Sequence, residues 1–230
     1  MAAALVMAAF STTAATVSLN LASGGTDTGY VYGNVRTFST ASGVTVTASA
    51  WSLTGGSNNK FESSYLGQYS GYGLGVCNRD EQCNNSDHRV DNNGRLDFVL
   101  FQFSAAVDPT IVTINPSGER FDLDASYWTG TTTNLSLAGK TLNNLDDVGL
   151  GDRKGSEGDK SSSPRNVTIN SGLVNSMLFG ADIFDNDDWF KIASITFNYT
   201  PPAQVPEPGS LALIALALGG LGLARRRRAA

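Results

Sequence analysis

Apolar and polar residues alternate along the stretch Val44-Thr45-Val46-Thr47-Ala48-Ser49-Ala50-Trp51. A period of two residues is typical of a β-strand that has one buried face and one polar face. Residues 96–103 are instead almost continuously apolar, and they include Phe98, Phe101 and Phe103. Such a run predicts a central strand that is covered on both faces. Together the two stretches favour a fold built from strands.

Further short runs of β-branched or apolar residues lie between turn residues, which is the pattern of additional strands. They cover residues 111–114, 135–137, 167–169 and 189–197. Turns are predicted where Gly, Asn, Asp, Ser and Pro gather, at residues 55–59, 108–109 and 115–118. The charged, glycine-rich and serine-rich residues 143–164 predict a mobile exposed loop.

A helical period extends no further than residues 173–181. Many short strands without helices predict an all-β fold. We expect a single antiparallel β-sandwich, jelly-roll-like, over residues 16–200. An N-terminal signal segment and a C-terminal transmembrane sorting helix are expected to flank it.

The charge of the chain limits its partners. The 230 residues have a net charge of −5, and 16% of them are charged. Residues 225–228 supply four of the 16 basic residues, so the residues before them have 12 basic and 21 acidic side chains. Such an acidic chain without an internal basic cluster is not expected to bind nucleic acid. The single histidine, His88, and the two cysteines are too few for a multi-histidine or four-cysteine metal site.

Residues 1–15 predict a signal peptide. They form a short apolar stretch that ends in small residues, which suits cleavage near Ala15. No Lys or Arg precedes the apolar run, since the first basic residue is Arg36. Either the true start lies upstream or the signal is atypical, and the alternative is a buried N-terminal helix.

The other end of the chain has three parts. Residues 201–208 are rich in proline, which disfavours helix and central strand and predicts a linker. Residues 209–224 are apolar or small apart from Ser210, and as a helix they would span about 24 Å of a hydrocarbon core of about 30 Å. They therefore predict a transmembrane helix, with the arginine-rich residues 225–230 as a cytoplasmic tail. A buried core helix is the alternative, and the four arginines argue against it.

The order of Pro206-Glu207-Pro208, an apolar span and an arginine cluster resembles the PEP-CTERM sorting signal of Gram-negative bacteria. The resemblance implies that a membrane-embedded exosortase recognises Pro206, Glu207 and Pro208, removes the anchor, and releases the protein or transfers it to the cell surface. A GPI signal is excluded, because its tail would end in apolar residues. Exosortase and, before cleavage, the membrane are therefore the expected partners.

The central part of the chain carries a second resemblance. Residues 73–76, 91–103 and 122–128 are similar to a pattern common among exosortase-dependent surface proteins. That resemblance implies a secreted β-sandwich.

Cys77 and Cys83 enclose five residues. In the oxidising compartment outside the inner membrane, we expect them to form a local disulfide that holds a polar surface loop. A metal-binding or catalytic thiol pair is the alternative, but the CxxC spacing is missing.

Carboxylates predict one candidate metal site. Asp91, Asn93 and Asp97 place oxygen ligands around a glycine turn, partly like the front of a calcium loop. A second acidic cluster comprises Asp182, Asp185, Asp187 and Asp188. Calcium is the cofactor that such residues suit, although Asn and Asp are also ordinary turn residues, and that alternative stays open.

No catalytic residues are predicted. A Gly-x-Ser-x-Gly elbow is missing from the sequence, and His88 lies between acidic residues in a polar loop. Six aromatic residues are candidates for stacking on sugars, although most aromatics of an all-β domain fill its core. They are Trp51, Tyr69, Tyr72, Tyr127, Trp128 and Trp189.

The sequence therefore predicts an exported, non-catalytic protein. It would begin as an inner-membrane-anchored precursor and work at the cell surface or in the extracellular matrix, in association with exopolysaccharide. A carbohydrate-binding module for matrix glycans is the second candidate. A secreted hydrolase is the third, because paired carboxylates alone can hydrolyse glycosidic bonds.

Overall fold

The computed structural model describes residues 13–57, 59–83, 88–117, 122–158 and 160–202. Residues 15–199 form one compact unit built from 14 strands and two short 3₁₀ turns. The strands are β1 (Ala15–Asn20), β2 (Thr26–Asp27), β3 (Val35–Ser39), β4 (Thr45–Leu53), β5 (Phe61–Ser63), β6 (Tyr65–Tyr69), β7 (Gly73–Cys77), β8 (Val90–Asp91), β9 (Asp97–Pro116), β10 (Ala125–Gly130), β11 (Lys154–Ser156), β12 (Arg165–Thr168), β13 (Val174–Ala181) and β14 (Trp189–Tyr199). The turns are η1 (Leu142–Asn144) and η2 (Asp146–Val148).

Named strands pair only in the antiparallel sense within the described ranges, which confirms the prediction of an all-β antiparallel fold. Its jelly-roll-like connectivity stays a prediction. Within these ranges we find no helix with the length and apolar character needed to cross a membrane. Residues 1–12 of the predicted signal peptide (1–15), residues 203–208 of the predicted linker with Pro206-Glu207-Pro208, and the predicted membrane helix and tail at 209–230 lie outside the described residues. Ala15, at the predicted cleavage point, is the first residue of β1.

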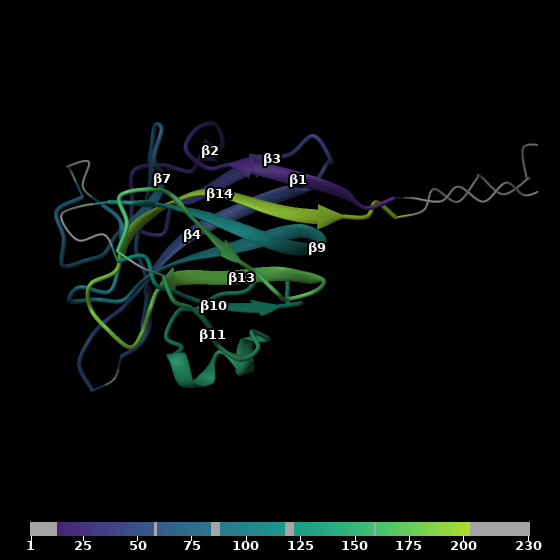
Figure 1. Cartoon of the computed structure of the whole chain (residues 1–230). Coiled ribbons are helices and arrows are strands. Elements are labelled where there is room, and N and C mark those ends of the chain that lie inside the picture. Colours follow the sequence, from purple (N-terminus) through teal and green to yellow (C-terminus); the bar gives the residue numbers. More distant parts are fainter. Residues whose placement is uncertain (1–12, 58, 84–87, 118–121, 159, 203–230) are drawn as a thin grey trace, which may run out of the picture. The chain divides into compact units, whose positions relative to one another are not determined.

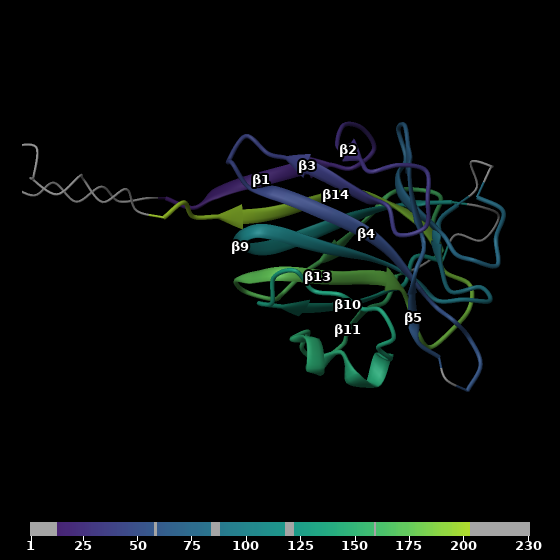
Figure 2. The ribbon, with the colours of Figure 1, turned by 180° about the vertical axis from the view of Figure 1, so that it is seen from behind.

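The long strand β9 belongs to two layers. Its N-terminal half pairs with β4 and β13, whereas its C-terminal half pairs with β14 and β12. We call the first layer sheet B, with strands β2, β3, β4, β5, β10, β11 and β13, and the second sheet A, with β1, β6, β7, β8, β12 and β14. Both views show β9 between β14 and β13 (Figures 1 and 2).

The main core lies between the two sheets. Val46, Ala48 and Ala50 of β4 point into it, while the residues between them are partly exposed, so the predicted alternation of this strand is confirmed. Aromatic contacts cross from sheet to sheet, with ring centroids 5.6 Å apart for Phe103 and Phe197. Burial of this apolar area supplies the main favourable free energy of folding.

The outer face of sheet B has a second core. Phe98 and Leu100 of β9 point into it, while Val99, Phe101 and Phe103 point into the main core. The segment that covers this face contains Leu135, Leu137, Leu145 and Leu150, and its short coils η1 and η2 lie beyond β10 in Figure 1. The prediction that residues 96–103 form a strand covered on both faces is therefore confirmed.

Two sequence predictions are wrong. Residues 135–137 form no strand, since Leu135 and Leu137 are buried by packing against the outer face of sheet B without joining a ladder. Asp108 and Pro109 form no turn either, because β9 continues through them. The pairing of β9 with β14 shifts register between Thr196 and Phe197, so β9 has one extra residue there. Such a bulge tolerates Pro109, which has no backbone N–H to donate to the neighbouring strand.

Two other segments have more order than their composition indicates. Residues 173–181, which have a helix-like period, form strand β13 in the middle of sheet B. Residues 143–164, predicted as an exposed loop, include η2 and β11 and bury Leu145 and Leu150. In both cases a neighbouring strand of sheet B supplies the partner that local sequence does not reveal.

Gly180 gives the first testable prediction. A Cβ atom at this position of β13 would lie 2.3 Å from Phe98 Cδ1 and 2.6 Å from the carbonyl oxygen of Asp97. Gly180→Ala is therefore expected to reduce the free energy of unfolding by about 1–3 kcal/mol, measured by urea denaturation. Gly151→Ala is the control, since its nearest atom is Thr129 O at 3.5 Å and the change should be small. Equal stability of the two variants would contradict this close packing of β13 against β9.

Candidate functional site

Asn92 joins the turn after β8 to the loop before β14. Its side-chain N–H groups donate to Asp182 O at 2.9 Å, Asp185 Oδ1 at 2.8 Å and Asp188 Oδ2 at 2.7 Å. Its amide oxygen accepts a bond from the backbone N–H of Asp188 at 3.0 Å. Asn92 is buried, so these bonds form away from water and are correspondingly strong. The loop over residues 182–188 is therefore held against the start of β9.

Asp188 also joins a group of three carboxylates. Its Oδ1 accepts a bond from the backbone N–H of Asp124 at 2.7 Å. Carboxylate oxygens of Asp122, Asp124 and Asp188 all lie within 4.8 Å of one another. Oxygen ligands of this kind suit Ca²⁺ or Mg²⁺, and the same arrangement also suits carboxyl groups that share protons. We call these three residues the Asp122 group.

Burial keeps part of the Asp122 group protonated. It raises the pKa of Asp188 to about 9, and a hydrogen bond with the Asp185 side chain adds to this shift. Burial also raises the pKa of Asp124 to about 6, with a further contribution from the charge of Asp122. Protons held in this way reduce the repulsion between neighbouring carboxylates.

Asp182 differs from these residues because it is ionised and paired. Burial acts to raise its pKa, but hydrogen bonds from Ser126 and from the backbone of Phe184, together with the charge of Arg153, hold the pKa below its ordinary value. Arg153 contacts Asp182 Oδ1 directly and also stacks on the Phe184 ring at 4.2 Å. Asp187, the remaining member of the predicted cluster, pairs with Lys160 at 3.2 Å. Of the four residues, Asp185 and Asp188 instead interact with each other, and this contact raises the pKa of Asp188.

The three predicted calcium ligands differ in burial. Asp91 and Asp97 are both buried, and the charge of Asp91 contributes to a large rise in the pKa of Asp97, after burial itself. Asn93 is exposed, and its backbone N–H donates to Asp91 Oδ1 at 3.1 Å as in an ordinary Asx turn. Burial, followed by the charge of Glu81, raises the pKa of Asp91 to about 7. The charge of Glu81, which the sequence did not single out, therefore acts on one of the predicted ligands.

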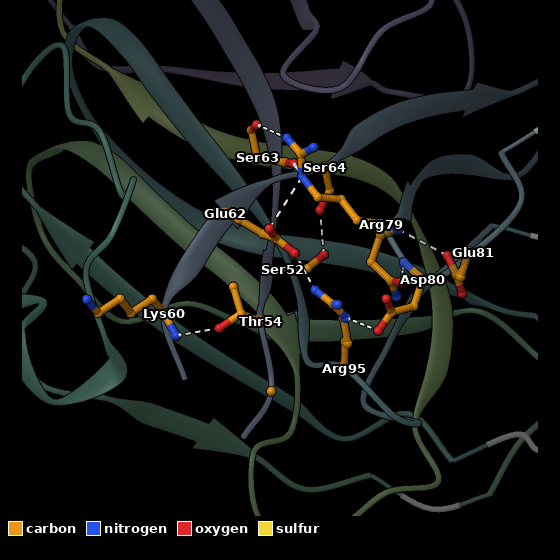
Figure 3. A network of polar contacts seen from close by, with 12 residues as sticks. Ser52, Thr54, Lys60, Glu62, Ser63, Ser64, Arg79, Asp80, Glu81 and Arg95 are labelled. Atoms are coloured by element: carbon orange, nitrogen blue, oxygen red, sulfur yellow. Dashed lines mark hydrogen bonds and ion pairs between the residues drawn. The ribbon is translucent and has the colours of Figure 1, made fainter. Parts of the chain in front are cut away.

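Cys77 and Cys83 form a disulfide, with Cα atoms 5.7 Å apart. The loop that they close carries Arg79, Asp80 and Glu81, which Figure 3 shows beside Glu62 and Arg95. Arg95 pairs with Asp80 and Glu62, and Arg79 Nε lies 3.4 Å from Glu62 Oε2. This ion-pair network attaches the disulfide loop to β5.

His88 is buried rather than solvated. Its side chain is 4% exposed, and Nδ1 lies 3.7 Å from Glu81 Oε2. A nitrogen of His88 and the sulfurs of Cys77 and Cys83 lie within 4.8 Å of one another, but the disulfide occupies both sulfurs, so this group does not suit a metal ion.

The predicted sugar-stacking residues are largely withdrawn from the surface. Tyr127 and Trp128 are buried in the two cores, which rules them out as a platform for a ligand. The other candidates are Trp51, Tyr69 and Trp189, which are partly exposed, and Tyr72, which is 60% exposed.

A different aromatic surface lies beside the disulfide loop. Tyr30 and Val31 are more than half exposed, and with Tyr32 and Tyr65 they line a hollow of about 500 Å³ that Gln82 and Cys83 complete. The rings of Tyr30 and Tyr65 are 4.5 Å apart, and the Arg79 guanidinium lies 4.7 Å from the Tyr32 ring. Aromatic faces with adjacent polar groups are suited to contact with amphipathic ligands such as sugars. We call this the tyrosine hollow.

Sequence reasoning missed three parts of these sites: the Asp122 group, Glu81 and the tyrosine hollow. Only the first has a local signal, because Asp122 and Asp124 are two residues apart and an extended chain points such side chains to one side. Glu81 and Tyr30 lie in loops. The neighbours of these loops are determined by the disulfide and by β5, which a local sequence pattern does not reveal.

Comparison with known proteins finds one match. The family model of the PEP-CTERM protein-sorting motif matches residues 204–228, which confirms the sorting signal predicted around Pro206-Glu207-Pro208. The motif indicates an exosortase-targeted extracellular protein whose precursor is anchored in the membrane. No curated protein and no solved structure matches the chain.

The raised pKa values of three aspartates predict how stability depends on pH. Asp188, Asp91 and Asp124 have pKa values of about 9, 7 and 6 in the folded protein, against an ordinary value of 3.8. At these three groups the folded state therefore binds more protons than the unfolded state from the ordinary value up to each raised value, so the stability that they contribute falls as the pH rises through this range. Asp185→Asn removes the carboxyl group that hydrogen-bonds to Asp188. The fall between about pH 7 and about pH 9 should then become shallower.

Melting temperatures measured across this pH range test the prediction. Asp187→Asn is the matched control, because Asp187 lies in the same loop but pairs with Lys160. Parallel pH curves for Asp185→Asn and the unmodified chain would show that Asp185 does not set the pKa of Asp188.

Proposed function

We propose that this chain is a non-catalytic protein of the cell envelope or extracellular matrix that associates with exopolysaccharide once an exosortase has processed it. The observation that carries the proposal is the sorting motif at residues 204–228. The motif directs the protein to the cell surface. The sandwich domain would be in contact with exopolysaccharide there.

The layout of the chain supports this proposal. The compact unit ends at Tyr199, and the exposed Pro201 and Pro202 separate it from the sorting motif. Cleavage beyond these prolines would remove no strand of the sandwich. The Cys77–Cys83 disulfide suits an oxidising compartment outside the inner membrane.

The positions of the carboxyl groups support a non-catalytic role. Asp97 and Asp188 have strongly raised pKa values, yet they are at most 1% exposed and are bonded to the sandwich itself. A hydrolase would place such groups where a substrate reaches them. We infer that these residues bear on stability, and the secreted hydrolase is the weakest of the three candidate functions.

The tyrosine hollow favours a more specific second candidate, which is a carbohydrate-binding module for matrix glycans. Tyr30 and Tyr32 are exposed tyrosines that line the hollow, and Gln82 adds a side-chain amide that can bond to hydroxyl groups. This surface takes the place of the Trp51 and Trp128 surface expected from the sequence, because Trp128 is buried.

Processing is tested by replacing the recognition element. The combined substitutions Pro206→Ala, Glu207→Ala and Pro208→Ala should leave the chain uncut in the membrane fraction of its host, as should deletion of the exosortase. Pro201→Ala with Pro202→Ala is the matched control, since both prolines lie outside the motif. The readout is fractionation with mass spectrometry of the C-terminus, and unchanged size and location in the triple variant would refute processing at this site.

Glycan recognition is tested on an array and then by calorimetry with the host's own exopolysaccharide. Loss of one ring in Tyr30→Ala or Tyr32→Ala is expected to weaken binding by about 2–12-fold, the equivalent of about 0.5–1.5 kcal/mol. Tyr72→Ala is the control, because Tyr72 is a similarly exposed tyrosine that does not line the hollow. Equal binding to every glycan, or full binding by the double tyrosine variant, would count against this candidate.

A further inference from the structure

The outer face of sheet B is only partly covered. Where the second core covers it, its outward side chains are apolar, as Phe98 and Leu100 of β9 show. Further along the same face the outward side chains are polar, with Thr45 and Thr47 on β4 and Gln102 on β9. These three residues are partly exposed. The open part of the face is therefore made of hydroxyl and amide groups.

Strand pairing arranges these polar side chains in rows, because β3, β4 and β9 lie side by side (Figure 2). Thr47 lies opposite Gln102 of β9 on one side and opposite Thr37 of β3 on the other. Thr45 lies opposite Ser39 of β3 in the same way. Cross-strand partners point to the same face, with Cβ atoms about 4.5–5.5 Å apart. Three neighbouring strands thus present hydroxyl and amide groups next to one another.

A groove of about 310 Å³ lies where this open face meets the loop that follows β10. The polar residues that line it are Thr45, Thr47, Gln102, Ser104, Thr133 and Asn134, and we call it the threonine groove. Phe103 completes the lining, but its ring packs on Phe197 in the main core. None of the described residues that line the groove carries a charge.

The loop wall of the threonine groove is fixed to its strand wall. Leu135 is buried in the second core, and its backbone N–H donates to Gln102 Oε1 at 2.6 Å. Asn134, which precedes it, has a φ of 55°, a left-handed conformation that asparagine adopts more readily than most residues. The groove is therefore formed before a ligand arrives, and binding requires little further ordering of the chain.

The groove offers polar groups that the protein itself does not use. In the described part of the chain, the side chains of Thr47, Thr133 and Asn134 make no hydrogen bond to another residue. Gln102 Oε1 is bonded to Leu135, so its Nε2 group is left as a donor. Hydroxyl and amide side chains both donate and accept hydrogen bonds, as the hydroxyl groups of a sugar do.

We propose that the threonine groove binds an uncharged segment of the exopolysaccharide. The inference rests on the proposed association with exopolysaccharide, and it adds a contact site that shares no lining residue with the tyrosine hollow. The uncharged lining selects neutral sugars. The carboxylate of an acidic sugar would lose water in this groove without meeting a cation, and that desolvation is unfavourable.

The test is calorimetry of the full chain with the exopolysaccharide of its host. The double variant Thr45→Val with Thr47→Val removes two hydroxyls and keeps the β-branched shape that suits a strand. Each lost hydrogen bond is expected to weaken binding by about 2–12-fold. Thr168→Val is the matched control, because Thr168 is an exposed threonine of β12 outside the groove. Equal affinity of the double variant and the unmodified chain would overturn the proposal.

Salt tests the class of ligand. Hydrogen bonds between uncharged groups are not screened by ions, so raising NaCl from about 0.05 M to about 0.5 M should change the contribution of the two threonines by less than about twofold. That contribution is the ratio of the affinities of the unmodified chain and the double variant. A larger loss of this ratio in salt would show that charged groups carry the contact, and it would overturn the assignment to a neutral glycan.

Two outcomes separate this inference from the proposed function. If the unmodified chain binds no exopolysaccharide, the proposed association is wrong and the threonine groove has no such ligand. If the chain binds, and Tyr30→Ala with Tyr32→Ala abolishes binding while the threonine double variant keeps it, the association stands. In that case the inference about the threonine groove alone is wrong.

Discussion

Backbone pairing along β9 is the interaction on which the rest of the structure depends. Its N-terminal half pairs with β4 and β13, and its C-terminal half pairs with β14 and β12, so one strand connects both sheets. Successive side chains of its first half enter the two cores in turn. This strand cannot be shifted by one residue without exchanging the side chains of both cores.

The start of β9 also determines where the acidic residues meet. Asp91 and Asn92 are neighbours in the sequence, yet the charge of Asp91 acts on the buried Asp97 while Asn92 bonds to Asp188 beside the Asp122 group. Adjacent residues of an extended chain point to opposite sides, so one short segment serves two polar clusters. Hydrogen bonds and ion pairs hold the loops at this end of the sandwich. The stability of these loops therefore depends on pH.

The disulfide loop connects two surfaces with different chemistry. Its Glu81 faces buried carboxylates, whereas Gln82 and Cys83 face the exposed rings of Tyr30 and Tyr32. Arg79 links the two sides, since it pairs with Glu62 and lies over the Tyr32 ring. The disulfide loop therefore forms part of the wall of the tyrosine hollow.

The sequence by itself determined the class of fold and the sorting signal. Alternation in residues 44–51 and the apolar run at 96–103 are local patterns, and the signal at 204–228 is read from contiguous residues, so neither depends on distant contacts. The pair Asp108-Pro109 led to the prediction of a turn that does not exist. A bulge in a long strand contains the same types of residue as a turn, so composition does not distinguish the two. Tertiary structure alone decided that the charge of Glu81 acts on Asp97, and that Tyr30 and not Trp128 is exposed. Burial and charge proximity result from the pairing of strands far apart in the chain, and a linear pattern does not contain them.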